Sequence, residues 1–279
     1  SEGTLGIFSE IGISIIPMPP VIWGVMAFFP SEESALKFVS SIRTTGRRPT
    51  AIEFFNHGAL NLLRSQKANN PAFSSVPEIA KEHHTAVYIE YHGNDEASVE
   101  NAVLNMSEVM TTSGGSENAT WLASDEARIS QLKQFRHAVP EAVNLLIDER
   151  RKKEPALAKL GTDLSVPDGR LDEVMQMYNR DLADAGLEYA IFGHIGNNHV
   201  HVNIIPNSMD DYRRGRQMYL KWAEWVVAAG GSVSAEHGIG KLKIDMLKTM
   251  YGETGILQMK QLRQCFDPSN ILCRGNLFI

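Results

Sequence analysis

The sequence has few cysteines, no long hydrophobic run and no excess of positive charge, and each lack excludes a class of protein. Two cysteines, Cys265 and Cys273, are too few for a disulfide framework, so we expect a reducing compartment. The most apolar run, residues 21–29, is about half as long as a membrane-spanning helix needs to be. The formal net charge of -6 leaves no basic stripe for nucleic acid. We therefore expect no nucleic-acid partner and no membrane span.

The start of the chain shows no targeting signal. It reads SEGTLGIFSE, without the basic stretch and apolar block of a signal peptide. With 279 residues, of which 43% are hydrophobic, the chain has the composition of a globular protein with a large core. We expect a cytoplasmic protein, or one that lies peripherally at the inner face of a membrane.

Alternating strand and helix patterns in the first half of the chain predict two consecutive β-α-β units. The expected strands are residues 21–29, 49–55, 84–92 and 119–123, and the expected helices are residues 31–44, 57–65 and 95–112. Isoleucine-rich strands are also expected within residues 1–17. Two such units indicate an α+β, ferredoxin-like fold, in which helices cover a mostly antiparallel sheet.

The second half of the chain is expected to add a helical insertion and further elements to this fold. A long polar helical region, residues 124–153, is expected to be interrupted at Pro140. The later elements are a short strand in GTDLSVP, helices at residues 171–185, 210–229 and 241–250, and a hairpin before the second of these helices. Trp222 and Trp225 have helical spacing and are expected in the core.

Three histidines cluster in the expected hairpin, residues 189–206. Residues 190–192 predict a buried strand, and the alternation of Val200, Val202 and Ile204 predicts a second one. Period-two geometry then places His199, His201 and Asn203 on the face opposite these apolar residues. His194 lies at the end of the first strand, so the hairpin can bring two or three imidazoles together.

His194, His199, His201 and Glu236 therefore form a candidate metal site. Zinc takes three or four nitrogen, oxygen or sulfur ligands, and histidines two residues apart on a strand offer two of them from one face. An open coordination position would make the site catalytic rather than structural. The alternative is a polar strand face in which the histidines only form hydrogen bonds. From the residues alone, the two interpretations are evenly balanced.

Two further residues are candidates for handling a substrate. His237 follows Glu236 in the loop EHGIG, where adjacent side chains diverge, so His237 can accept a proton while Glu236 faces a metal. The alternative is an ordinary glycine-rich helix entry. Arg136 carries a guanidinium fork that suits a carboxylate, although an arginine on a long charged helix is more often solvated.

Five motifs, SEGTLGI, GTDLSVP, GHIGNNHVHVN, SAEHGIG and DPSNIL, occur in the order typical of one family. On these motifs essentially the whole chain resembles the C-terminal, substrate-binding half of the FAD-linked oxidases, which include D-lactate and D-2-hydroxyglutarate dehydrogenases and the flavin subunit of glycolate oxidase. The resemblance implies an FAD-dependent oxidoreductase that oxidises a small D-2-hydroxy acid and passes electrons to an unidentified acceptor. It implies that FAD is bound mainly by a domain or subunit outside this chain, so we expect the chain alone to be inactive.

The resemblance also assigns regions and residues. Residues 19–279 correspond to the substrate- and metal-binding domain, and residues 1–18 to the last edge of the FAD-binding domain. It implies that His194, His201 and Glu236 hold a divalent metal, usually zinc, and that His237 takes the hydroxyl proton while a hydride leaves for the flavin. The remaining implied contacts are a substrate carboxylate at Arg136, a pocket wall at Asn203, and the edge of the flavin site at Gly3, Thr4, Gly6 and Ile7.

Three departures from the family pattern limit this transfer. The C-terminal N-P-G-K of the family is replaced here by residues 273–276, CRGN, which puts in doubt the contacts of that tail. The usual G-D-G-N-L-H is here GNNHVH, so His199 occupies an asparagine position and is an unexplained extra histidine. A lysine that some members carry two residues before the aspartate of TDLSVP is replaced by Gly161. The choice of substrate therefore cannot be transferred. Two other hypotheses stay open: a stand-alone zinc-dependent hydrolase, and a non-catalytic binding module with a decayed site.

Overall fold

A single seven-stranded sheet organises the protein, with every strand pair antiparallel in the part of the chain that the structure describes. The computed structural model describes residues 1–44 and 46–278. The strands are β1 (Val21–Phe29), β2 (Ala51–Phe55), β3 (Thr85–Gly93), β4 (Thr120–Ala123), β5 (Leu160–Gly161), β6 (Tyr189–Gly193) and β7 (His201–Ile204). They stand in the order β4-β1-β3-β2-β6-β7-β5.

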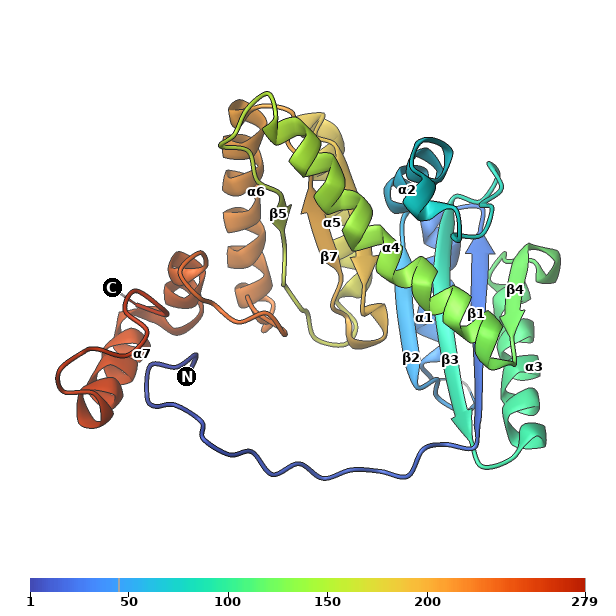
Figure 1. The fold of residues 1–279 in the computed structure, drawn as a ribbon, viewed down its shortest axis with the longest axis horizontal. Helices are drawn as coiled ribbons and strands as arrows, with labels where there is room; N and C mark the ends of the chain where they lie inside the picture. The colour runs from blue at the N-terminus through green and yellow to red at the C-terminus, as the bar shows by residue number, and fades with distance from the viewer. Residues whose placement is uncertain (45, 279) are drawn as a thin grey trace.

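Helices cover both faces of this sheet and bury a separate apolar cluster on each (Figure 1). The α-helices are α1 (Glu32–Ile42), α2 (His57–Asn69), α3 (Glu96–Thr112), α4 (Glu126–Arg151), α5 (Leu171–Ala185), α6 (Met209–Ala228) and α7 (Ile244–Phe266). The larger cluster joins the sheet to α1, α3, α5 and α6, and the smaller one joins it to α2 and α4. Short 3-10 turns, η1 (Pro71–Phe73), η2 (Glu117–Ala119) and η3 (Ile195–Asn197), lie in the connections.

The ferredoxin-like prediction is confirmed in the first half of the chain. β1-α1-β2 and β3-α3-β4 interleave as β4-β1-β3-β2, with both helices on one face. The helices begin where a side chain can satisfy a free backbone amide. Ser31 accepts from Ser34 N before α1, and Asp95 accepts from Ser98 N before α3. The sheet then continues through β2, which pairs with β6 of the histidine hairpin.

The strands expected within residues 1–17 are not formed, and that prediction is wrong. The segment is extended and its large apolar side chains are exposed, with Ile7 86% and Ile15 85% accessible. A strand needs another strand to pair with, and none of the described strands pairs with this segment. Figure 1 shows the segment leaving β1 and crossing to α7, where both ends of the chain lie.

Three boundaries in the second half also differ from the predictions. Helix α4 runs unbroken through Pro140, because buried residues on both sides, from Leu132 to Ile147, hold it against the sheet. The strand in GTDLSVP shrinks to Leu160–Gly161, and Ser165 forms isolated bridges instead. Helix α7 begins at Ile244 and extends to Phe266, with a break at Gly252 where φ is 66°.

Two findings bear on the environment of the protein. Both cysteines are free and exposed. Within residues 1–44 and 46–278, every helix is too short or too polar to span a membrane.

Two neighbouring histidines make stability depend on pH. The rings of His57 and His84 lie 4.9 Å apart, and burial lowers the pKa of each, with His84 lowering that of His57 further. The unfolded chain therefore takes up protons first as the pH falls below about 6.5, and stability is lost down to the lowered folded-state pKa. We expect the unfolding free energy to drop between about pH 7.5 and pH 5.5, and to drop less in the double variant His57→Gln/His84→Gln. Equal drops in urea titrations of both proteins would refute this.

Candidate metal and substrate site

The side chains of the histidine hairpin lie on the faces of the sheet that the sequence predicts. His201 stands opposite Phe192 and Asn203 opposite Ala190 in the β6–β7 ladder, while Val202 and Ile204 point into the larger apolar cluster. The connection between the strands needs a left-handed backbone, with φ of 131° at Gly193. A Cβ at Gly193 would lie 2.8 Å from His201 Cδ2, so a glycine there lets the imidazole lie against the turn.

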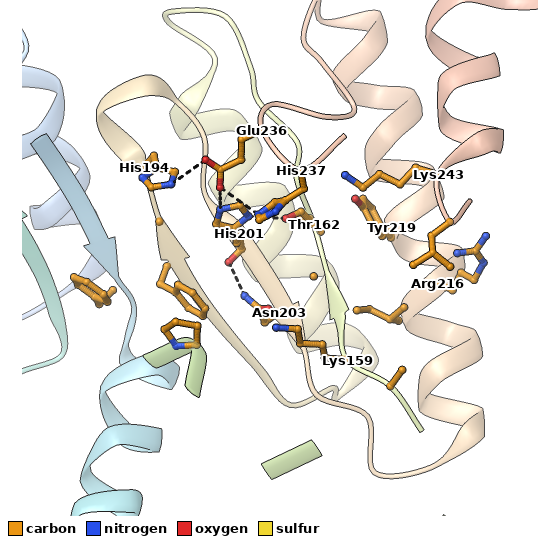
Figure 2. Close-up of a pocket in the computed structure, with 18 of the residues that line it drawn as sticks. Lys159, Thr162, His194, His201, Asn203, Arg216, Tyr219, Glu236, His237 and Lys243 are labelled. Carbon is orange, nitrogen blue, oxygen red and sulfur yellow. Dashed lines mark hydrogen bonds and ion pairs between the residues drawn. The ribbon is translucent and has the colours of Figure 1, made fainter. Parts of the chain in front are cut away.

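Three side chains converge here, two from the hairpin itself and one from a later loop. Glu236 reaches both imidazoles: Oε2 lies 3.2 Å from His194 Nε2, and Oε1 lies 3.1 Å from His201 Nε2. One donor atom from each residue falls within 4.8 Å of the others. Figure 2 shows the carboxylate placed between the two rings, with His237 beside it. The sequence-predicted grouping of His194, His201 and Glu236 is therefore present in the fold.

The other nitrogen of each imidazole is held by the protein. His194 Nδ1 lies 2.9 Å from Glu53 Oε1, and His201 Nδ1 lies 2.8 Å from the carbonyl oxygen of Thr162. With a proton on each Nδ1, both Nε2 lone pairs face Glu236. In known metal sites, a backbone carbonyl or carboxylate behind a metal-binding imidazole fixes the orientation of the ring in the same way. Two histidines, one carboxylate and held Nδ1 atoms therefore fit a divalent metal such as zinc.

Burial and neighbouring charges shift the pKa values of the site residues. The hydrogen bond with Glu53 raises the pKa of His194, while burial lowers the pKa of His201. Burial by itself would raise the pKa of Glu236, but the surrounding histidines, His194 first, outweigh it and lower that pKa. An anionic Glu236 facing two imidazole nitrogens gives one negative ligand and two nitrogen ligands, which suits a dication.

The extra histidine has a partner that the sequence did not reveal. His199 Nε2 lies 3.1 Å from Asp163 Oδ1, with both side chains almost fully buried, although the contact lacks the alignment of a hydrogen bond. Asp163, His199 and His201 are close enough to form a second set of ligands. However, Lys243 Nζ lies 2.7 Å from Asp163 Oδ2. Because an ammonium already occupies this carboxylate, we assign His199 to the support of Asp163 rather than to a metal.

A cavity of about 640 Å³ opens beside the three converging residues. The residues predicted to act line it together: His194, His201, Glu236, His237, Arg136 and Asn203. His237 is 62% exposed, with Nε2 3.2 Å from Glu236 Oε1. Arg136 Nη2 lies 2.8 Å from Glu53 Oε1, so it is paired rather than simply solvated. The cavity wall does not include Gly3, Thr4, Gly6 or Ile7, and their assignment to a flavin edge stays a prediction.

Two acidic residues of the site were missed from the sequence. Glu53 interrupts the apolar strand AIEFF and is 5% exposed, and an acid inside such a strand was a signal of a buried partner. Asp163 lies in the motif GTDLSVP and is 1% exposed. Burial by itself would raise the pKa of Asp163, but His199, Lys243 and Ser234 outweigh it and hold that pKa well below its ordinary range.

Comparisons with known proteins agree with the resemblance inferred from the motifs. The family described as FAD linked oxidases, C-terminal domain, matches residues 18–277. The chain is 29% identical to a probable mitochondrial D-lactate dehydrogenase of Danio rerio, over 99% of this chain and 52% of that protein. It is 27% identical to the glycolate oxidase subunit GlcD of Bacillus subtilis, over 100% of this chain and 55% of that protein. It is also 27% identical to a mitochondrial D-2-hydroxyglutarate dehydrogenase of Bos taurus, over 98% and 47%.

Solved structures share the fold at low sequence identity. p-Cresol methylhydroxylase with substrate bound matches with a TM-score of 0.64 at 15% identity, over 95% of this chain and 54% of that one. 4-Ethylphenol oxidase from Gulosibacter chungangensis matches with a TM-score of 0.62 at 15% identity, over 95% and 55%. At this identity the likeness concerns the fold alone. The chain spans about half the length of the curated relatives that it matches.

Proposed function

Because the chain belongs to the family of C-terminal domains of FAD-linked oxidases, we propose that it is the substrate- and metal-binding part of an FAD-dependent oxidoreductase acting on a D-2-hydroxy acid. Relatives named for D-lactate, glycolate and D-2-hydroxyglutarate support this substrate class. The observation that carries the proposal is the convergence of His194, His201 and Glu236 beside His237 in one cavity.

The three converging residues are the proposed ligands of a divalent metal, with zinc preferred. A metal bound there would supply Lewis acidity, which lowers the pKa of the substrate hydroxyl. In this arrangement Glu53 keeps His194 turned toward the metal position, and the Thr162 carbonyl does the same for His201. Glu236 provides the negative charge.

The remaining residues of the cavity bind the substrate and move its proton. We assign His237 Nε2 as the acceptor of the hydroxyl proton, since this exposed imidazole stands next to the ligand set. The Arg136 guanidinium is assigned to the substrate carboxylate, and Asn203 to the cavity wall. FAD, bound outside residues 1–279, would supply the acceptor for the hydride that leaves the substrate Cα.

The partners follow from the same assignment. We propose that FAD is bound mainly by a domain or subunit outside residues 1–279, that residues 1–18 form an edge of its site, and that residues 19–279 form the substrate domain. An electron acceptor must reoxidise the flavin. For the location of the protein we propose the cytoplasm or the inner face of a membrane, a choice supported by the two free cysteines.

The proposal is tested on the complete flavoprotein. We expect about one zinc per protein, by analogy with single catalytic zinc sites, and anaerobic bleaching of the flavin by D-lactate, glycolate or D-2-hydroxyglutarate but not by the L-isomers. Removal of the metal should slow the bleaching, and zinc should restore it. Unchanged bleaching after complete metal removal would refute the metal assignment. Hydrolysis that requires zinc but no flavin would favour the alternative of a stand-alone hydrolase, and a protein that holds neither group would favour a binding module.

Arg136→Met separates substrate binding from the rest of the chemistry. Loss of a charge-assisted clamp on a carboxylate costs about 2–3 kcal/mol, so we expect KM of the complete enzyme to rise roughly 30- to 150-fold. Arg216→Met is the matched control, because Arg216 lines the same cavity but its nearest acid, Asp245, lies 3.8 Å away at the surface. Equal rises of KM in both variants would exclude a specific role for Arg136.

A further inference from the structure

The loop that carries Glu236 and His237 has no regular secondary structure. Residues 234–240, SAEHGIG, connect the region after α6 to the region before α7. Without a helix or strand, the backbone amides of such a loop need other acceptors, and a site built on it needs rigid support. The structure supplies both through two carboxylates that come from opposite parts of the chain.

Asp163 holds the first half of the loop. Its Oδ1 accepts from Glu236 N at 3.2 Å, and its Oδ2 accepts from His237 N at 3.0 Å. Oδ2 also accepts from Ser234 Oγ at 2.6 Å and from Lys243 Nζ at 2.7 Å. The Asp163 carbonyl oxygen accepts from Ala235 N at 2.9 Å. One buried carboxylate thus contacts the backbone of both functional residues and the first turn beyond the loop.

Glu2 holds the second half of the loop in the same way. Its Oε1 accepts from Ile239 N at 2.6 Å, and its Oε2 accepts from Gly240 N at 2.7 Å. Gly238 between the two halves has a φ of 74°, and a Cβ there would lie 2.7 Å from Glu2 Oε1. Glycine at 238 therefore allows both the turn and the approach of the carboxylate.

The contact of Glu2 ties the loop to the start of the chain. Asn276 Nδ2 donates to the Glu2 carbonyl oxygen at 3.4 Å, and a Cβ at Gly3 would collide with Cys273 Sγ at 2.6 Å. Residues 1–4 are thus docked near α7, whereas the following segment is extended and exposed (Figure 1). Residues 1–4 are therefore held at the loop by their own contacts.

We propose that Asp163 and Glu2 are positioning residues that clamp four backbone amides of the 234–240 loop and thereby set Glu236 and His237 against the hairpin. Charge-assisted hydrogen bonds are roughly twice as strong as neutral ones, and two such pairs restrain a short loop at both ends. Through Glu2, the segment that the proposed function places at the flavin edge is mechanically connected to the metal ligands. This last consequence rests on the proposed function, whereas the clamp itself does not.

The test uses Asp163→Asn and Glu2→Gln in the metal-free chain. In each variant, one carboxylate oxygen is replaced by an NH₂ group, which is a donor and cannot accept from a backbone N–H. Each variant therefore loses one of the two backbone hydrogen bonds that the carboxylate accepted. We expect hydrogen exchange to accelerate at the amides of residues 236 and 237 in Asp163→Asn, and of 239 and 240 in Glu2→Gln. Asp95→Asn is the control, because Asp95 accepts from Ser98 N in another part of the fold. Loop exchange as slow as in the unchanged chain would overturn the clamp.

A second readout tests the effect on the ligand set. We expect both variants to bind Zn²⁺ about 10- to 100-fold more weakly by calorimetry, the range typical of residues that orient metal ligands. The visible spectrum of bound Co²⁺ should also change. Faster loop exchange with unchanged zinc affinity would refute the positioning role. If the unchanged chain binds no metal, the proposed function fails, while the exchange measurement still decides the clamp. Should Asp163→Asn not fold, Glu2→Gln alone decides it.

Discussion

Glu236→Gln is expected to lower the affinity of the chain for Zn²⁺ by more than about 100-fold, since loss of a residue behind a ligand already costs up to that amount. Glu236 is the single carboxylate of the set, and its two oxygens lie 3.2 Å and 3.1 Å from the two Nε2 atoms. Glutamine keeps the shape but presents a neutral oxygen and an N–H₂ group that cannot bind a cation. Calorimetric titration with Zn²⁺ measures the loss.

His137→Ala is the matched control for this experiment. His137 lines the same cavity but contributes no atom to the converging set. Its replacement should leave the zinc affinity within about twofold, as expected of a side chain without a ligand role. His201→Ala should resemble Glu236→Gln, because it removes the Nε2 ligand and the hydrogen bond to the Thr162 carbonyl together. Zinc binding that survives both changes would show that the metal, if bound, lies elsewhere.

Trp222→Ala is expected to destabilise the fold by about 3–5 kcal/mol, the cost of emptying a large aromatic site in a core. Trp222 is 0% exposed, and its ring centroid lies 4.7 Å from that of Tyr178 in an edge-to-face arrangement. Its Nε1 donates to Asp181 Oδ2 at 2.9 Å, so the substitution also removes a donor from that carboxylate. The free energy of unfolding from urea titration measures the effect.

Trp225→Ala on the same helix is the control. Trp225 is only partly buried, and the guanidinium of Arg170 lies 5.2 Å from its ring centroid. Losing this contact and part of an apolar surface should cost roughly 1–2 kcal/mol. If both variants lost the same stability, the two tryptophans would contribute equally, and the assignment of Trp222 to the centre of the core would be wrong.

Local patterns in the sequence were sufficient for most of the elements. The strand 21–29 and the helix 171–185 have the predicted bounds. Hydrophobic period and capping residues act over a few positions, so they can be recognised without a partner. The facing of His201 and Asn203 follows from the same period-two rule. The ferredoxin-like arrangement could be predicted because two β-α-β units follow one another along the chain.

Patterns failed where a distant neighbour decides the outcome. The isoleucines of residues 1–17 alternate like a strand, but no described strand pairs with this segment in the fold. Pro140 normally ends a helix, yet packing on both sides of it preserves α4. The sequence alone also left the partners of His199, Glu53 and Arg136 open, since each pair joins residues from separate elements.

The sequence by itself determined the fold class, the hairpin and the group of residues that could act, because these depend on local periodicity and on motifs in order. The tertiary structure alone decided that Glu236 lies between His194 and His201 and that Asp163 and Glu2 hold its loop. Glu2 and Ile239 are 237 positions apart in the chain. Such contacts form only when the folded sheet and helices bring the segments together, and no local pattern records them.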